Sequence, residues 1–109
     1  MVSGPQEGTG PTWNDVQSTV EALETQSGAQ VVLRVRFYKA GPKGHRSASV
    51  VAAACRGAGA SATEIAYGYY GFRGAGGAST MPAAMYMALL MLQDKLDARR
   101  DKAQQQSAF

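Results

Sequence analysis

The residues best suited to bind an anion lie in one loop and in the segment before it. Residues 41–46 read Gly-Pro-Lys-Gly-His-Arg, so a Gly-Pro turn precedes three side chains that donate hydrogen bonds: Lys43, His45 and Arg46. Arg34 and Arg36 stand at alternate positions of the preceding strand-like segment and therefore share one strand face. These donors suit a surface of phosphates and hydroxyls, provided that the fold aims them in one direction.

The charge of the chain is segregated along the sequence. The net charge is only +3, yet residues 30–56 hold six lysines and arginines and no acid, whereas residues 1–29 hold four acids and no lysine or arginine. Such a cluster is typical of a surface that binds a polyanion. It equally fits a solvated sheet face that an acidic helix partly neutralises, and the sequence leaves both interpretations open.

Catalytic chemistry has little support. His45 is the single histidine, Cys55 is the single cysteine, and no group of carboxylates accompanies either, so no triad, metal set or acid–base pair can be assigned. One cysteine also excludes an internal disulfide and a cysteine-based zinc site. The glycines of residues 74–77 lack the lysine and threonine of a phosphate-binding loop. We therefore expect no enzyme activity, no metal site and no cofactor.

The elements that must position the basic residues follow from hydrophobic spacing. Thr12 is a suitable N-cap for a helix that carries apolar residues at helical spacing as far as Leu23 and ends at residues 27–28. Alternation predicts strands over residues 31–39, 47–55 and 63–72, with Ile65, Tyr67 and Tyr69 on one face of the third strand. A second helix begins at Ser79 or Thr80 and contains residues 79–93 without a charge.

This order predicts an α+β fold, α-β-β-β-α, in which a three-stranded antiparallel sheet packs against two helices. We expect one domain over residues 12–97, a flexible N-terminal arm over residues 1–11 and a polar C-terminal tail over residues 98–109. The uncharged stretch of the last helix is shorter than the roughly 20 residues that cross a bilayer, and the N-terminus does not read as a signal peptide. The sequence therefore predicts a cytoplasmic protein with no membrane partner.

Two segments predict contact with a partner subunit. The third strand reads Tyr-Gly-Tyr-Tyr-Gly-Phe-Arg over residues 67–73 and should lie at a sheet edge, where it can pair with a second copy or stack unpaired bases. The last helix is apolar around much of its circumference, and the first helix should cover part of it through Trp13, Val16 and Val20. The rest favours contact with another subunit or a larger core. The residues that we expect at an oligomer interface are Tyr67, Tyr69, Tyr70, Met85 and Leu89.

The element order resembles that of the double-stranded-RNA-binding domain family over about residues 12–96. That family has a Gly-Pro-x-His-like loop between its first two strands, a glycine-rich turn after the third strand and a serine at the start of its last helix. The matching residues here are Gly41, Pro42, His45, Gly74, Gly76 and Ser79, followed by Ala83, Ala88 and Leu92 in the helix. The family also carries a Lys-Lys-x-Ala-Lys cluster at the helix start, which this chain replaces with Thr80, Met81 and Ala84.

The resemblance implies duplex or structured RNA as a partner, bound by a degenerate member of the family. We therefore expect a nucleic-acid-binding or ribonucleoprotein accessory module that self-associates. One alternative is a structural or protein-interaction subunit without RNA binding, and a weaker one is single-stranded nucleic-acid binding on the aromatic sheet face. The expected nucleic-acid-binding residues are Lys43, His45, Arg46, Ser79, Thr80, Arg34, Arg36 and Arg73.

Overall fold

A computed structural model describes residues 11–40, 45–73 and 80–107 of the chain. The elements are helix α1 (Trp13–Ser27), strands β1 (Gln30–Ala40) and β2 (His45–Arg56), a short 3₁₀ turn η1 (Gly59–Ser61), strand β3 (Thr63–Arg73) and helix α2 (Thr80–Ser107). The predicted α-β-β-β-α order and the α+β class are confirmed.

Helix α1 has the ends that its sequence predicts. The backbone N–H of Asp15 donates to the Thr12 hydroxyl at 3.3 Å, and the backbone N–H of Thr12 donates to the Asp15 carboxylate at 2.7 Å. These two bonds form a capping box that satisfies backbone groups at the helix start. At the other end Gly28 takes a φ of 68° and donates its N–H to the Glu24 carbonyl at 2.9 Å. Glycine adopts this left-handed conformation without steric cost, which ends the helix.

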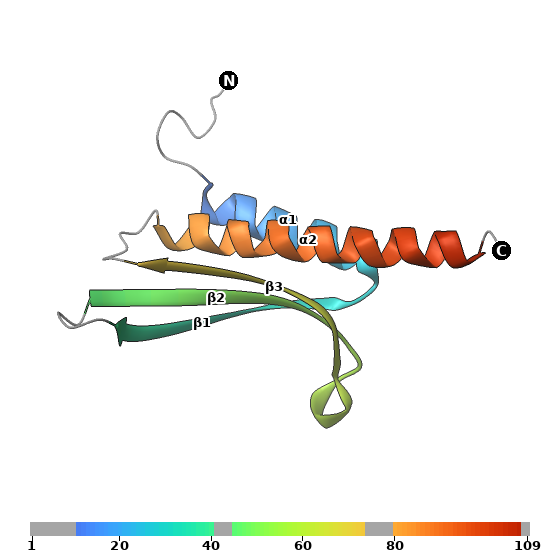
Figure 1. The fold of residues 1–109 in the computed structure, drawn as a ribbon, viewed down its shortest axis with the longest axis horizontal. Helices are drawn as coiled ribbons and strands as arrows, with labels where there is room; N and C mark the ends of the chain where they lie inside the picture. Colours follow the sequence, from blue (N-terminus) through green and yellow to red (C-terminus); the bar gives the residue numbers. More distant parts are fainter. Residues whose placement is uncertain (1–10, 41–44, 74–79, 108–109) are drawn as a thin grey trace, which may run out of the picture.

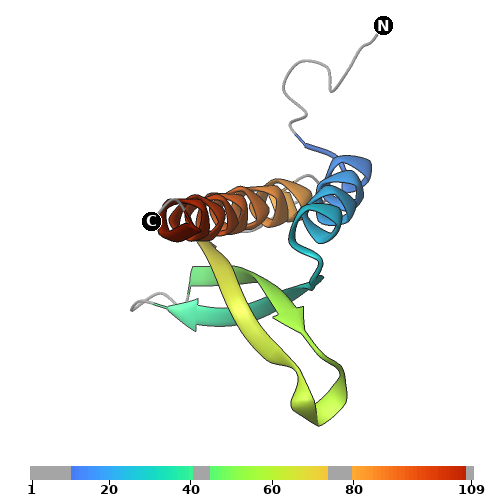
Figure 2. The same cartoon turned by 90° about the vertical axis from the view of Figure 1, so that its right-hand side faces the viewer.

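The three strands form one antiparallel sheet in the order β1-β2-β3, so both outer strands have a free edge within the described chain. Val35 pairs with Val50, and Val50 pairs with Tyr70. Both helices cover the same face of this sheet, and no described element covers the other face (Figures 1 and 2). We call the uncovered side the open face.

The core lies between the helices and the covered face. Leu23 of α1, Val50 of β2, and Leu89 and Leu92 of α2 are its largest fully buried side chains. Alanines fill the positions between them, because the helix packs directly against the sheet. At Gly68 the β3 backbone is so close to α2 that a Cβ there would overlap the Ala88 carbonyl oxygen and the Leu92 nitrogen. The small residues therefore set the distance between α2 and the sheet.

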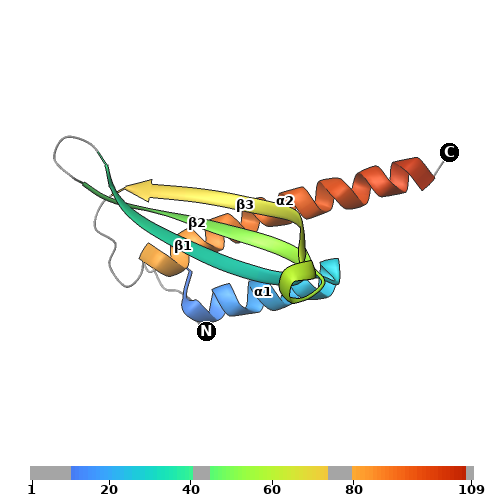
Figure 3. The same cartoon turned by 90° about the horizontal axis from the view of Figure 1, so that it is seen from below.

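Helix α2 is longer than the sheet that supports it. Leu96 is the last of its buried residues, and the helix continues past the sheet and past α1 in Figure 3. Residues 98–107, expected as a polar tail, continue α2, and residues 98–105 are exposed. The β2–β3 hairpin bends away from the helices at the same end of the molecule (Figure 1).

Two expected packing positions are wrong. Trp13, which was expected to help cover α2 together with Val16 and Val20, is largely exposed. Helix α1 packs through Val16, Val20 and Leu23. Ile65 was expected to share a face with Tyr67 and Tyr69, but it packs against the core. The reason is a shift in the β2–β3 register between Ala54 and Cys55, which changes the alternation of side chains.

Candidate nucleic-acid interface

The open face carries cations on one outer strand and aromatic rings on the other. The strand register places Arg34 of β1, Val51 of β2 and Tyr69 of β3 in one row across the sheet. Arg36, Ser49 and Gly71 form the next row. In the first row a large side chain on each outer strand flanks the smaller Val51, and in the second row Arg36 faces the small residues Ser49 and Gly71. Strand alternation places the side chains of both rows on the same face.

The two tyrosines of the open face present much of their surface to solvent. Tyr67 is 54% exposed and Tyr69 is 52% exposed. The hydroxyl end of Tyr69 lies over Gly71. A Cβ built on that glycine would be only 2.9 Å from the Tyr69 hydroxyl oxygen. The glycine thus leaves room for the ring to lie along the strand. An exposed ring held in this way can stack on a planar partner.

The arginines of the open face are exposed and carry uncompensated charge. Among the residues that the structure describes, the only ion pair joins Arg100 and Asp97 of α2, at 3.4 Å. Arg34 and Arg36 therefore pair with no described carboxylate. The backbones of two residues at alternate positions of a strand lie about 7 Å apart along it. Arg34 and Arg36 can therefore meet two different phosphates of one extended nucleic-acid strand.

The predicted loop site cannot be assembled from the described residues. Lys43 and Ser79 lie outside them. His45 and Arg46 start β2, and their backbones pair with Ala40 and Lys39. The side chains of both, and those of Thr80 and Arg73, also lie outside what the structure describes. Arg73 pairs with Ser47 in the backbone register of the β2–β3 ladder.

The start of α2 differs in burial as well as in charge from the Lys-Lys-x-Ala-Lys cluster of the family that the sequence resembles. Ala84, the third position that lacks the family's lysine, is buried in the core cluster. Met81 is half-buried and packs against that cluster. A lysine at position 84 would place its ammonium group in the core, so introducing the family's lysine there would destabilise the fold.

The residues expected at an oligomer interface do not lie on one common surface. Only Tyr67 and Tyr69 lie on the open face, whereas Tyr70 and Met85 pack partly buried against the core. Leu89 is fully buried within the chain's own core, and its assignment to an interface is therefore wrong. Among the described residues of α2, the exposed large apolar side chains are instead Met87 and Met91, at 39% and 42% exposure. Their spacing of four residues puts them on one side of the helix.

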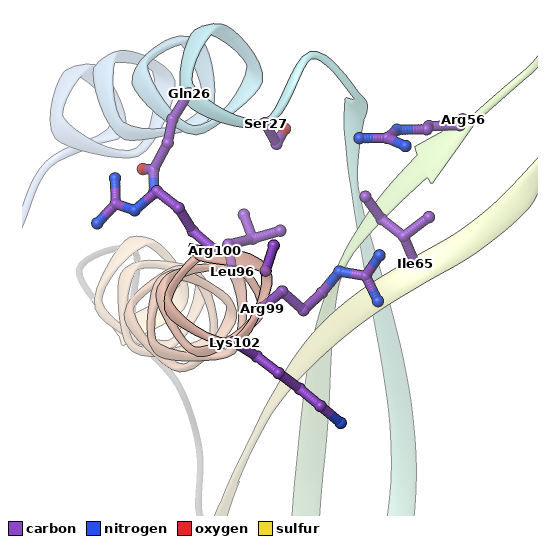
Figure 4. A pocket seen from close by; sticks show the side chains of 9 residues that line it. Gln26, Ser27, Arg56, Ile65, Leu96, Arg99, Arg100 and Lys102 are labelled. Carbon is purple, nitrogen blue, oxygen red and sulfur yellow. The ribbon is translucent and has the colours of Figure 1, made fainter. Parts of the chain in front are cut away.

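A second basic site was missed by sequence reasoning. A pocket of about 510 Å³ opens where the overhanging part of α2 faces the end of α1 and the end of β2 (Figure 4). We call it the C-terminal pocket, and its lining includes Arg56, Arg99, Arg100 and Lys102. A signal was present in the sequence, because both inward-facing stripes end in arginine: Arg56 follows Ala54 on β2, and Arg99 follows Leu96 on α2.

No set of three metal-binding side chains gathers anywhere in the described parts of the chain. None of the described helices is long and apolar enough to span a membrane.

Comparison with protein-family models, with curated proteins and with solved structures finds no match to this chain.

Proposed function

We propose that this protein binds single-stranded nucleic acid on the open face of its sheet. The observation that carries the proposal is the cross-strand row of Arg34, Val51 and Tyr69, which brings an exposed cation and an exposed ring to the two sides of a floor of small residues. Single-stranded nucleic acids bind such surfaces through phosphate contacts and base stacking together. RNA is the first candidate, because the element order resembles that of duplex-RNA-binding domains.

The magnitudes favour a modest, sequence-tolerant interaction. Stacking one base on an exposed ring contributes about 1–3 kcal/mol, and the two open-face tyrosines offer two such positions. Each arginine that meets a phosphate adds an electrostatic contribution that weakens as salt rises. A surface of two rings and two arginines therefore supports binding of a short segment rather than recognition of a base sequence.

Duplex RNA is less well supported than a single strand. Duplex binding in the resembled family uses the helix start and the loop between the first two strands, and Ala84 at that helix start is buried. A paired duplex also hides the faces of its bases, which leaves Tyr67 and Tyr69 nothing to stack on.

A titration that compares two matched pairs of variants tests the proposal. Fluorescence anisotropy with a labelled 12-nucleotide oligouridine should give a tenfold or larger loss of affinity for Tyr67→Leu combined with Tyr69→Leu, since leucine keeps an apolar strand side chain and removes the ring. Arg34→Gln with Arg36→Gln should reduce the salt slope by about 1.4, the value expected for two lost phosphate contacts on a single strand.

Arg56→Gln with Arg99→Gln is the matched control, because it removes the same charge from the opposite side of the sheet. Its effect on oligouridine binding should be smaller than that of the open-face pair. Equal losses in the two arginine pairs would mean that only net charge matters. The proposal would be rejected if a duplex bound more tightly than oligouridine and if none of the open-face substitutions changed the affinity for that duplex.

A second candidate is assembly of protein subunits through β3. The strand has a free edge in the described chain, and Met87 and Met91 add exposed apolar surface on α2, the helix packed on that strand. Edge strands and exposed methionines are both typical of protein contacts. This role and nucleic-acid binding can coexist, because the strand edge and the open face are different surfaces.

A further inference from the structure

The C-terminal pocket joins three elements at the end of the molecule where the sheet stops supporting α2. Gln26 and Ser27 come from the end of α1, Arg56 and Ile65 come from β2 and β3, and Leu96 and Arg99 come from α2. Figure 4 shows Arg56 and Arg99 extending toward Ile65 from the strand and from the helix. The pocket therefore has an apolar base with a guanidinium group on each side.

The charges around this pocket are strongly one-sided. Four of the side chains that line it are cationic and none is acidic. Arg100 is partly neutralised by Asp97, whose carboxylate also accepts a hydrogen bond from Gln26 at 2.8 Å. Arg56, Arg99 and Lys102 form no ion pair with any described residue. Arg56 and Arg99 therefore bring two guanidinium groups to this pocket, whereas the Lys102 side chain extends away from Ile65 in Figure 4. No acidic residue lines the pocket, although Glu64 lines the adjoining hollow that shares Arg99 and Lys102.

The remaining groups fit an oxygen-rich anion. The Ser27 hydroxyl oxygen accepts from the Ala29 backbone N–H at 3.1 Å, which leaves its own proton to donate to a ligand. The C-terminus of α1 brings a partial negative charge of about half a unit to the same region, and this opposes an anion. The cations outweigh it, since the full charges of Arg56 and Arg99 face that partial one. Guanidinium groups bind phosphate through paired hydrogen bonds, which selects phosphate over a simple halide.

We propose that the C-terminal pocket is a binding site for the phosphate groups of a small phosphorylated ligand, of the size and charge of a nucleoside diphosphate. Its volume of about 510 Å³ falls in the range of small-molecule sites. Ile65 and Leu96 supply an apolar surface for the uncharged part of the ligand. The site is separate from the open face, because Arg56 lies on the side of β2 that faces the helices, and it does not rest on the function proposed for that face.

Calorimetric titration of the full chain with pyrophosphate, ADP and adenosine tests this site. Pyrophosphate and ADP should bind with saturation at one site per chain, whereas adenosine should bind at least about 10-fold more weakly, because it lacks the phosphates that the arginines hold. Arg56→Gln with Arg99→Gln should reduce the affinity for pyrophosphate by about 10-fold or more. Amide resonances of residues 27, 56, 65 and 99 should shift during the titration.

Arg34→Gln with Arg36→Gln is the matched control, because it removes two arginines from the open face. This pair should change pyrophosphate affinity by less than about twofold, since exposed charges more than a Debye length away are largely screened. Equal losses in both pairs, or no saturable binding of pyrophosphate, would overturn the proposal. With oligouridine the ranking should be reversed: the Arg34 and Arg36 pair should lose more affinity than the Arg56 and Arg99 pair. Failure of this site is therefore distinguishable from failure of the open face. All four positions are exposed, and circular dichroism checks that each variant folds.

Discussion

Gly68 of β3 lies directly against the backbone of Ala88 in α2, closer than any side chain would allow. The contact joins the longest helix to an outer strand, and Ala88 itself is fully buried. It therefore sets the height of α2 above the sheet, and with it the positions of the residues at both ends of the helix. The core is narrow here because both partners are the smallest residues available.

Gly68→Ala should be strongly destabilising. The new Cβ would overlap backbone atoms of α2, which cannot rotate away as a side chain can, so the helix must shift. We expect a loss of about 3 kcal/mol in the free energy of unfolding, at the upper end for overpacked cores, measured by urea denaturation. Gly71→Ala is the matched control, because its Cβ meets only the Tyr69 hydroxyl end, which can move. A change of less than about 1 kcal/mol is expected there. Similar losses at the two glycines would contradict the close contact between β3 and α2.

Thr12→Ala should weaken the start of α1. The substitution removes the hydroxyl that accepts from the Asp15 backbone N–H and leaves that donor without its partner. We expect a loss of about 1 kcal/mol in the free energy of unfolding. Ser18→Ala, on an exposed position inside α1, should instead be neutral or slightly stabilising because alanine is the better helix former. If both changes had the same effect, the capping box would contribute nothing.

Leu89→Ala should be costly because it opens a cavity in the core. The side chain is fully buried between α2 and the sheet, and such truncations cost about 2–5 kcal/mol. Met87→Ala, two positions earlier on an exposed side of the same helix, should cost less than about 1 kcal/mol. Denaturation of both variants decides the matter. A loss at Leu89 as small as that at Met87 would contradict the burial of Leu89 in the core.

Replacing Met87 and Met91 together by serine tests assembly through α2. The two exposed side chains contribute little to the core, so the variant should keep its unfolding transition within a few degrees. If the wild-type chain self-associates through this side, sedimentation velocity should show the variant shifted toward the monomer of 11.4 kDa. An unchanged sedimentation profile in an associating wild-type protein would place the interface elsewhere, with the free edge of β3 next to be tested.

The element order and the ends of the first helix could be predicted from local patterns in the sequence. Thr12, Asp15 and Gly28 act through neighbours in the chain, so local chemistry was sufficient to predict where α1 begins and ends. The strands followed from alternation for the same reason. Arg34 and Arg36 could be placed on a common face, because a strand turns its side chains to alternate sides whatever it packs against.

Which residues meet across elements depends on tertiary packing, and the local patterns did not predict it. The pairing of Arg34 with Val51 and of Val51 with Tyr69 depends on the register of three strands, and a shift of one residue would have moved every side chain to the other face. Ile65 was misplaced because a register shift interrupts the alternation near it. Leu89 and Met87 are equally apolar in the sequence, and the side of α2 that faces the sheet determines that one is core and the other is surface. The C-terminal pocket lies where the overhanging part of α2 faces the bent β2–β3 hairpin. Arg56 and Arg99, which both line it, are 43 positions apart in the sequence. Such contacts depend on the packing of distant segments, which no local pattern specifies.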